Sequence, residues 1–426
     1  MKDKIDKRLF KKKIFITTTA LVGGIGTFLK DFIKIAIKNK SYIKLIVFFS
    51  RNSEDYRVIN YFIKEFPQIE IVFIDIKSNN IIKKIFEISL KSIIFFKTIF
   101  DKKPDIIFNN TTPETLIFIF FKKFFFKSIP LIFQFHGAFS YERYGEEKYF
   151  LLLNDNQFIF KKIKLIFLRI KFFVRKFYDF LVYKNVDKIV VFSKYANNFL
   201  INNFRINPKK IFLIKPGIFL LKNINVKKIN KNLNKIKLGF NNKINLIIIV
   251  SRLEPRKGII EAIKALGYLK NERNDFLSLL ISPMNLSFNE YFYNVLFFVN
   301  KLKLGKNLMF INNPPPKEIK QLIRAADLLI MPSIDLETFG FVTLEALASA
   351  TPIIAFDIGA NSELIDRNVG FIVDVIQPYA LKKKVDYFLN LKKNIKEKMQ
   401  HECLKKAKSY NWNSYFNNLL KISKIN

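Results

Sequence analysis

The chain of 426 residues is poor in several residue types, and each shortage excludes a class of protein. It has one cysteine, Cys403, so it cannot form an intrachain disulfide framework, and we expect a reducing compartment. It also lacks a long uncharged apolar run. The most apolar window, residues 116–135, is interrupted by Lys122, Lys123 and Lys127. A spanning helix needs about 20 largely uncharged residues, so we expect no transmembrane segment and a cytoplasmic protein.

Acidic residues are scarce. Lys and Arg number 73 against 35 Asp and Glu, which gives a net charge of +38. Such an excess favours a nucleic-acid or membrane partner. It also fits a bias toward A/T-rich codons, because Lys, Ile, Asn and Phe dominate and the lysines are spread along the chain. Both interpretations stay open at this point.

Glycine is scarce as well, with 13 residues, less than half of the usual share of ~7 per cent. We therefore expect the glycines that are present to lie where the backbone geometry requires them.

Short apolar runs alternate with longer helical segments along the whole chain. The runs of the first half are KIFITT, IKLIVFF, IEIVFID, DIIFNN, PLIFQF, DKIVVF and IFLI, and those of the second half are INLIIIV, LSLLIS, NLMFIN, DLLIMP, PIIAF and GFIVD. Near-continuous apolar strands separated by helices indicate parallel sheets that are covered on both faces. The sequence thus predicts an α/β protein with two Rossmann-like, doubly wound domains that face a cleft.

The predicted domain boundary lies near Pro216-Gly217, ahead of an Asn/Lys-rich stretch. We expect an N-terminal domain over residues 1–217 and a C-terminal domain over 218–404. The last helical segment, about 405–426, has no strand after it and is expected to cross back onto the first domain.

Two loops of the first domain are candidates for ligand contact, because ligands bind at the carboxyl ends of parallel strands. One is the turn with Gly23, Gly24, Gly26 and Thr27 after the first strand, where glycines let a ligand approach a helix N-terminus. It lacks the order of a dinucleotide fingerprint. The other carries His136-Gly137 after the fifth strand, with a hydrogen-bonding or proton-handling histidine as the functional interpretation.

The second domain offers a basic turn, SRLEPRKG, after its first strand. Arg252 and Lys257 lie five residues apart, and Gly258 leads into a helix. A guanidinium fork and an ammonium at a helix N-terminus suit a diphosphate. A solvated basic turn is the plainer interpretation.

The stretch ETFGFVTLE places Glu337 in a loop and Glu345 in the first turns of a helix that starts near Gly340. Two carboxylates can form an acid/base couple or a metal clamp, or they can accept hydrogen bonds from ligand hydroxyls. No further acidic or histidine cluster supports a metal, although Asp335 is near, so we expect none. Hydroxyls that flank a phosphate at the helix start fit a sugar nucleotide.

These motifs resemble the retaining glycosyltransferases of family 4 with the GT-B fold, also described as glycosyl transferases group 1. ETFGFVTLE resembles the E-x7-E element of that family, SRLEPRKG its diphosphate turn and GGIGT its glycine loop. The resemblance extends through HG, DKIVVFSKYANNFL, KPGI, PIIAFDIGANSELI and NVGFIVD, and so covers nearly the whole chain.

The resemblance implies a role for each matching position. Arg252 and Lys257 would hold the donor diphosphate, and Glu337 would bond the donor sugar. Glu345 would take the ribose, and His136 would lie beside the sugar. His136, Arg252, Lys257 and Glu337 are thus the predicted catalytic residues. The other predicted donor-binding residues are Gly24, Ser251, Phe339, Gly340 and Phe341, and the acceptor side would be formed by Gly23, Gly24, Gly26 and Thr27.

The implied reaction is metal-independent transfer of a sugar with retention of anomeric configuration. The co-substrate would be a UDP- or GDP-linked sugar, with no other cofactor, and the acceptor a glycan or lipid-linked molecule of envelope polysaccharide or lipopolysaccharide synthesis. A non-catalytic GT-B-like protein and a basic nucleic-acid-binding protein are the alternatives. The dispersed charge and the lack of a nucleic-acid module argue against the second.

Two segments, residues 81–100 and 161–180, carry basic residues on one side of a helix. Basic helices with aromatic residues suit an anionic membrane. An ordinary sheet-covering helix is the alternative. Membrane contact would place the protein at the inner face of the cell membrane.

Overall fold

The structure is a computed structural model of the chain. It describes residues 12–19, 21, 23–49, 60, 62–75, 103–125, 127–154, 158–220, 231–282 and 290–424. The predicted helix over residues 81–100 lies outside this described part.

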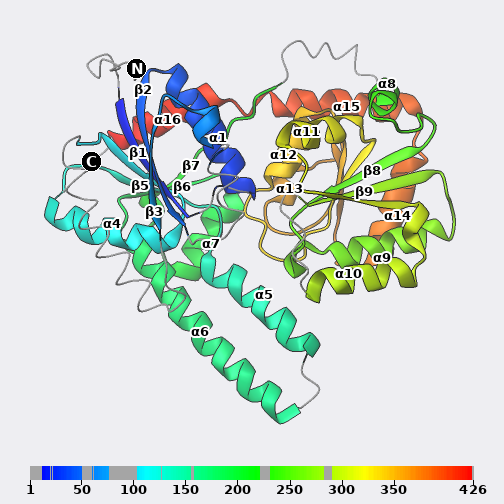
Figure 1. The fold of residues 1–426 in the computed structure, drawn as a ribbon, viewed down its shortest axis with the longest axis horizontal. Coiled ribbons are helices and arrows are strands. Elements are labelled where there is room, and N and C mark those ends of the chain that lie inside the picture. The colour runs from blue at the N-terminus through cyan, green and yellow to red at the C-terminus, as the bar shows by residue number, and fades with distance from the viewer. Residues whose placement is uncertain are drawn as a thin grey trace. The chain divides into compact units, whose positions relative to one another are not determined.

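Seven parallel strands form the first sheet, in the order β3-β2-β1-β4-β5-β6-β7 (Figure 1). Their bounds are β1 (Lys12–Thr18), β2 (Ser41–Phe49), β3 (Glu70–Asp75), β4 (Ile106–Asn109), β5 (Leu131–Gln134), β6 (Lys188–Val191) and β7 (Ile211–Leu213). Every residue of β4, β5 and β6 is buried. Burial on both faces explains why these strands are read as apolar runs without alternation.

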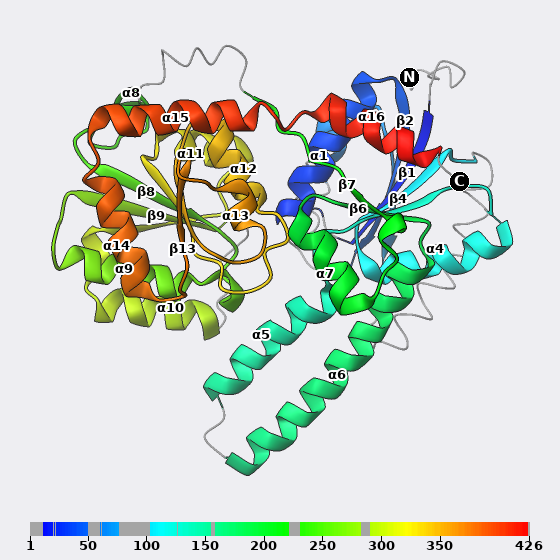
Figure 2. The same ribbon diagram turned by 180° about the vertical axis from the view of Figure 1, so that it is seen from behind.

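Helices cover both faces of this sheet. Figures 1 and 2 show α1 (Gly23–Lys38) and α16 (Trp412–Ser423) on one side, and α4 (Thr112–Phe125) and α7 (Lys194–Phe204) on the other. The helix α16 is held by its apolar stripe, with Trp412, Tyr415 and Phe416 buried, and the Tyr415 hydroxyl donates a 2.7 Å hydrogen bond to Gln134 of β5. A C-terminal segment is thereby part of the N-terminal sheet's core.

Six parallel strands form the second sheet, in the order β10-β9-β8-β11-β12-β13. Their bounds are β8 (Asn245–Val250), β9 (Phe276–Ser282), β10 (Leu308–Asn312), β11 (Leu328–Met331), β12 (Ile353–Phe356) and β13 (Gly370–Val373). Strands β11 and β8 pair with Leu328 opposite Ile247. All thirteen predicted strands are present, each within two residues of its predicted bounds, so the predicted fold class is confirmed.

The helices around the second sheet share its core. Helices α9 (Ile259–Lys270), α10 (Glu290–Lys301) and α14 (Pro378–Leu389) bury side chains in one cluster with β8, β9 and β11. The other α-helices among the described residues of this part are α8 (Lys231–Lys237), α11 (Pro316–Ala325), α12 (Phe341–Ala348), α13 (Asn361–Leu364) and α15 (Lys393–Ala407). Figures 1 and 2 show α11 and α12 across the sheet from α9 and α10.

The chain divides into two compact units. The first comprises Met1–Phe139, Arg175–Gly217 and Trp412–Asn426, and the second comprises Ser140–Val174 and Ile218–Asn411. The predicted boundary after residue 217 does not anticipate that Ser140–Val174 groups with the second unit. This segment contains α5 (Phe139–Asn154) except for its first residue, and the part of α6 (Phe158–Asn185) that precedes Arg175. The ring of Tyr149 on α5 lies 5.5 Å from that of Tyr291 on α10, which explains the grouping.

Candidate functional site

The site predicted in the second unit lies where the strand order of its sheet reverses. Strands β8 and β11 are neighbours, but the chain leaves β8 toward β9 on one side and β11 toward β12 on the other. At such a point the loops that follow the two strands diverge, which leaves room for a ligand at the carboxyl ends of the strands. Ser251, Arg252 and Lys257 follow β8, and Glu337 follows β11. The two motifs are therefore brought to one edge of the sheet.

The turn after β8 and the loop after β11 are in close backbone contact. Residues Pro255–Lys257 form a 3-10 turn that ends at Gly258, which has φ of +62°. A Cβ at Gly258 would lie 1.9 Å from the carbonyl oxygen of Pro332. The Ile334 amide donates a 2.9 Å hydrogen bond to the Arg256 carbonyl. Only glycine allows this approach, which places Lys257 beside the β11 loop.

A second glycine fixes the backbone of Glu337 from the other side. Gly359, after β12, has φ of +62°, and a Cβ there would lie 2.0 Å from the Glu337 carbonyl oxygen. The Ala360 amide donates a 2.8 Å hydrogen bond to that oxygen. The backbone of Glu337 is thus clamped between the turns that follow β8 and β12, and this fixes the direction in which its side chain extends.

Lys257 and Glu337 form an ion pair in this clamp. Lys257 Nζ lies 2.7 Å from Glu337 Oε2, and the two side chains are only 14% and 10% exposed. The Ser333 hydroxyl donates a 2.9 Å hydrogen bond to the same oxygen. The sequence motifs predict separate ligand contacts for these two charges and do not predict their pairing.

The environment shifts both pKa values. Burial lowers the pKa of Lys257, and the charge of Glu337 opposes this shift only in part. Burial alone would raise the pKa of Glu337, but the charges of Lys257 and Arg256 and the hydrogen bonds to Lys257 and Ser333 outweigh it, so the pKa is lowered. Glu337 is therefore ionised at neutral pH and acts as a hydrogen-bond acceptor, not as a general acid.

Two more cations lie in the same turn. Arg252, at 37% exposure, pairs with Glu254 at 2.6 Å. Arg256 is buried, contacts Glu254 at 3.1 Å and Glu142 of α5 at 3.6 Å, and donates to the Leu336 carbonyl. Burial opposes the charge of Arg256, but the nearby carboxylates outweigh this effect and raise its pKa.

Sequence reasoning missed Arg256, Glu254 and Ser333. The signal for Arg256 was its place beside Lys257 in PRKG, but nothing local shows that Arg256 is buried whereas Arg252 is only partly buried.

The helix α12 begins where the sequence predicts. Gly340 is its N-cap, with φ of +88°, and Glu345 lies in its second turn, partly buried. Phe339 is buried, with its ring 5.2 Å from that of Phe341 and 6.1 Å from that of Tyr410. The N-terminus of this helix adds positive potential to the end of the loop that carries Glu337.

In the first unit the predicted glycine turn follows β1, at the point where the strand order reverses between β1 and β4. Helix α1 begins at Gly23, so Gly24, Gly26 and Thr27 lie in its first turns, and Gly24 is exposed. This helix starts earlier than the sequence indicates: Gly24 and Gly26 belong to its first turns, and Gly23, with φ of +64°, stands at its start.

His136 follows β5 and is half-buried in an aromatic surround. Its ring centroid lies 5.2 Å from that of Phe28 and 5.6 Å from that of Phe192. Burial lowers its pKa from 6.5 to about 3. The imidazole is therefore neutral at physiological pH and cannot serve as a cation there.

Asn110 determines which nitrogen of His136 carries the proton. The Asn110 amide donates a 3.4 Å hydrogen bond to the Thr17 carbonyl, which turns Oδ1 toward His136. His136 Nε2 lies 3.2 Å from that oxygen and must donate to it, because Oδ1 is only an acceptor. Nδ1 then carries a lone pair and can accept a hydrogen bond, for example from a hydroxyl. The sequence gave no signal for Asn110 beyond its position after β4.

A buried carboxyl group supports the neighbouring loop. Glu114, in the first turn of α4, is 1% exposed and accepts a short hydrogen bond from the Thr111 hydroxyl. Thr111 Oγ1 in turn accepts a 2.9 Å hydrogen bond from the Thr19 amide after β1. Burial raises the pKa of Glu114 from 4.5 to about 8, so its carboxyl group is largely protonated at neutral pH. Nothing in the sequence around Glu114 predicts this role.

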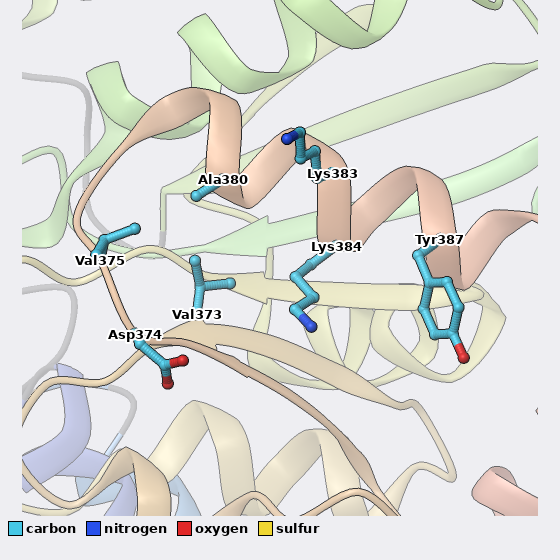
Figure 3. Close-up of a pocket in the computed structure, with 7 residues that line it drawn as sticks. All are labelled: Val373, Asp374, Val375, Ala380, Lys383, Lys384 and Tyr387. Atoms are coloured by element: carbon cyan, nitrogen blue, oxygen red, sulfur yellow. The ribbon is translucent and has the colours of Figure 1, made fainter.

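A pocket of about 420 Å³ lies elsewhere in the second unit (Figure 3). It is lined by Val373, Asp374, Val375, Ala380, Lys383, Lys384 and Tyr387. None of the predicted site residues lines it. Figure 3 shows the lysines and Tyr387 on α14, and Asp374 on the segment after β13.

No three His, Cys, Asp or Glu side chains of the described ranges come together in a way that could hold a metal ion. No helix within that part of the chain is both long and apolar enough to cross a membrane.

Comparisons with known proteins match both units. Residues 22–220 match the model described as Glycosyltransferase Family 4, and residues 230–410 match the model described as Glycosyl transferases group 1. A D-inositol 3-phosphate glycosyltransferase of Corynebacterium glutamicum is 25% identical over 234 residues, which is 54% of each chain. The alignment thus spans about half the length of this curated relative.

Solved structures match the fold over nearly the whole chain. An Anabaena HepE structure in complex with UDP-glucose has a TM-score of 0.71 at 16% identity, and the match covers 96% of this chain and 99% of that one. WaaG, described as a glycosyltransferase involved in lipopolysaccharide biosynthesis, has a TM-score of 0.67 at 14% identity, with 97% and 100% covered.

Proposed function

Because the chain belongs to the glycosyltransferases of family 4 with the GT-B fold, we propose that it transfers a sugar from a nucleotide-sugar donor to a glycan or lipid-linked acceptor. The observation that carries this proposal is the clamped Lys257–Glu337 pair, which lies between the turn after β8 and the start of α12. A cation and an ionised carboxylate at a strand-order reversal match a ligand with both phosphate and hydroxyl groups.

In this proposal the basic turn binds the donor diphosphate. Arg252 is the more exposed cation and would exchange Glu254 for phosphate oxygens, which a guanidinium can bind in a bidentate way. Lys257 would add a point charge, and Arg256 would hold the turn through its buried carboxylate contacts. The donor would be a UDP- or GDP-linked sugar, and the complex of HepE with UDP-glucose supports a donor of this class.

The carboxylates would bind the two ends of the donor. Glu337, ionised and fixed by its backbone, would accept hydrogen bonds from sugar hydroxyls, and Glu345 from the ribose. Backbone amides of Phe339, Gly340 and Phe341 would face the phosphate. His136 would accept a hydrogen bond from a hydroxyl at Nδ1, since its Nε2 proton is directed to Asn110.

The proposed mechanism is electrostatic. Cations and the α12 N-terminus would stabilise the charge that develops on the leaving diphosphate, and could do so without a metal ion. Ionised Glu337 is engaged by Lys257 and Ser333, so it is better suited to binding than to nucleophilic attack. A displacement on one face of the sugar, assisted by the leaving phosphate, would retain the anomeric configuration.

For the acceptor we propose a chemical class. The resemblance to WaaG supports lipopolysaccharide or envelope polysaccharide assembly, and the curated relative supports transfer to a phosphorylated polyol. A lipid-linked acceptor would place the enzyme at the inner face of the cell membrane.

A donor screen that measures the release of nucleoside diphosphate tests the proposal. Lys257→Ala and Glu337→Ala should reduce release to background while the fold persists. The matched controls are Lys317→Ala and Glu318→Ala, which change exposed residues of α11 and should leave turnover unchanged. Near wild-type turnover in either site variant would refute the site, and a wild-type protein that releases no diphosphate with any sugar nucleotide would favour a non-catalytic GT-B protein.

A further inference from the structure

Helix α6 carries a continuous apolar face that the protein leaves exposed. Seven large apolar side chains are between 45% and 64% exposed. They are Ile163, Ile166, Phe167, Ile170, Phe173, Val174 and Phe177. Single exposed apolar residues are ordinary, but a contiguous row of this length on one helix marks an interaction surface.

The seven side chains form one stripe. At ~100° per residue they fall within an arc of about 120° around the helix axis. The opposite side packs on the protein: Leu168 is 5% exposed, Asp179 is fully buried, and the Phe172 ring lies 5.1 Å from that of Tyr141 on α5. The helix therefore has two apolar sides, and only one of them is needed for the fold.

Basic residues border the exposed stripe on both sides. Lys164 and Lys171 follow one edge and Lys162 and Arg169 the other, and all four are exposed. The single acidic residue of the helix, Asp179, is buried on the packed side. The outward-facing surface of α6 is thus an apolar band between two rows of positive charge.

We propose that this face of α6 lies on an anionic lipid bilayer. The Phe and Ile side chains would enter the boundary between headgroups and acyl chains, and the lysines and arginine would extend sideways to lipid phosphates. Charge complementarity favours this partner, because both edges of the stripe are basic and no exposed acid interrupts them. Figures 1 and 2 show α6 as one long helix, so the stripe is a straight surface that a planar bilayer can cover.

Other occupants fit less well. Two copies of the chain that met through this stripe would bring rows of like charge together, which opposes association. A nucleic acid would engage the basic residues but would leave the apolar band uncovered.

Co-sedimentation of the full chain with vesicles tests the proposal, with phosphatidylcholine alone compared with phosphatidylcholine plus phosphatidylglycerol. The protein should bind the anionic vesicles more tightly, and salt should weaken binding. The triple variant Phe167→Ser/Ile170→Ser/Val174→Ser should lose binding. The matched control Tyr293→Ser/Phe297→Ser removes exposed aromatic residues of α10 and should bind like the wild type.

Two further measurements separate lipid contact from a folding defect. Lys164→Gln and Lys171→Gln should each weaken partitioning by about fivefold. An Ile170→Trp variant should show a blue shift of its fluorescence on addition of anionic vesicles.

The proposal is overturned if the wild type does not bind anionic vesicles at low salt. It is also overturned if the triple variant binds as well as the wild type. Light scattering gives the third contrary outcome: a dimer that the triple variant converts to a monomer would assign the stripe to a second copy of the chain. Vesicle binding does not depend on any sugar donor, so these results are independent of the proposed transfer reaction.

Discussion

Breaking the Lys257–Glu337 ion pair on one side should destabilise the second unit more than removing both charges. Nζ and Oε2 are 2.7 Å apart and both side chains are largely buried. Two unit charges about 4 Å apart attract by about 4 kcal/mol at an effective dielectric constant of ~20. Burying the two ions costs several kcal/mol each, so the attraction and the desolvation cost nearly offset.

A single substitution removes the attraction but leaves one desolvated charge. We expect Lys257→Met to lower the free energy of unfolding by about 3 kcal/mol, at the lower end of the usual range because Ser333 and Arg256 still stabilise Glu337. The double variant Lys257→Met/Glu337→Gln should lie within about 1 kcal/mol of the wild type, since no buried charge of the pair remains. Transfer activity should be absent from both, because the donor needs the charges themselves.

Urea unfolding followed by two probes measures the effect. Trp412, the single tryptophan, lies in the first unit, so its fluorescence reports that unit, whereas far-ultraviolet circular dichroism reports both. The change should appear in circular dichroism and not in fluorescence. The exposed pair Lys393 and Glu397, 3.9 Å apart, is the control, and Lys393→Met should change stability by less than about 0.5 kcal/mol.

The reasoning is refuted if Lys257→Met and the double variant are equally unstable, since the cost would then come from lost packing and not from an unpaired charge. Recovery of transfer in the double variant would refute the assignment of these charges to donor binding.

Three other perturbations follow from buried groups and backbone contacts. Glu114 keeps its proton in the folded protein between pH 4.5, its ordinary pKa, and about pH 8, whereas the unfolded chain loses it. The free energy of unfolding should therefore fall as the pH rises through this window, by up to about 1.4 kcal/mol per pH unit. Urea titrations at several pH values measure this slope, and Glu114→Gln should remove it. Asn110→Asp should raise the pKa of His136 by placing a carboxylate at Nε2, which an NMR titration detects; an unchanged pKa would contradict the proposed contact. Gly359→Ala should lower the free energy of unfolding by more than about 1 kcal/mol, because the added Cβ would lie 2.0 Å from the Glu337 carbonyl oxygen. The control Gly305→Ala, where the added Cβ meets open space, should change it by less than about 0.5 kcal/mol. Equal melting temperatures for the two variants would contradict the close contact at Gly359.

Much of the fold could be predicted because its signals are local. Each strand is an apolar run long enough to be recognised, and each run is separated by a helical segment. The parallel order follows, since buried strands joined by helices have few other arrangements. The division of the chain into units was harder to predict. Ser140–Val174 belongs with the second unit because side chains of α5 reach the core of that unit, and no local pattern encodes that contact.

The candidate site shows the same division. Its residue types could be found from the turns that carry them, including Lys257 before a glycine and Glu337 before Gly340. Their pairing could not, because the two residues are 80 positions apart and meet only after β8 and β11 pair. The neutral state of His136 and the protonated state of Glu114 also depend on burial by distant elements.

The sequence by itself determined which residues form the strands, where the turns of the candidate site lie and that α6 has basic and apolar sides. The tertiary structure decided which charges meet, which titratable groups lose water, and which apolar side of α6 is covered. The physical reason is that periodicity defines the faces of an element, whereas burial and pairing depend on what another part of the chain places against each face.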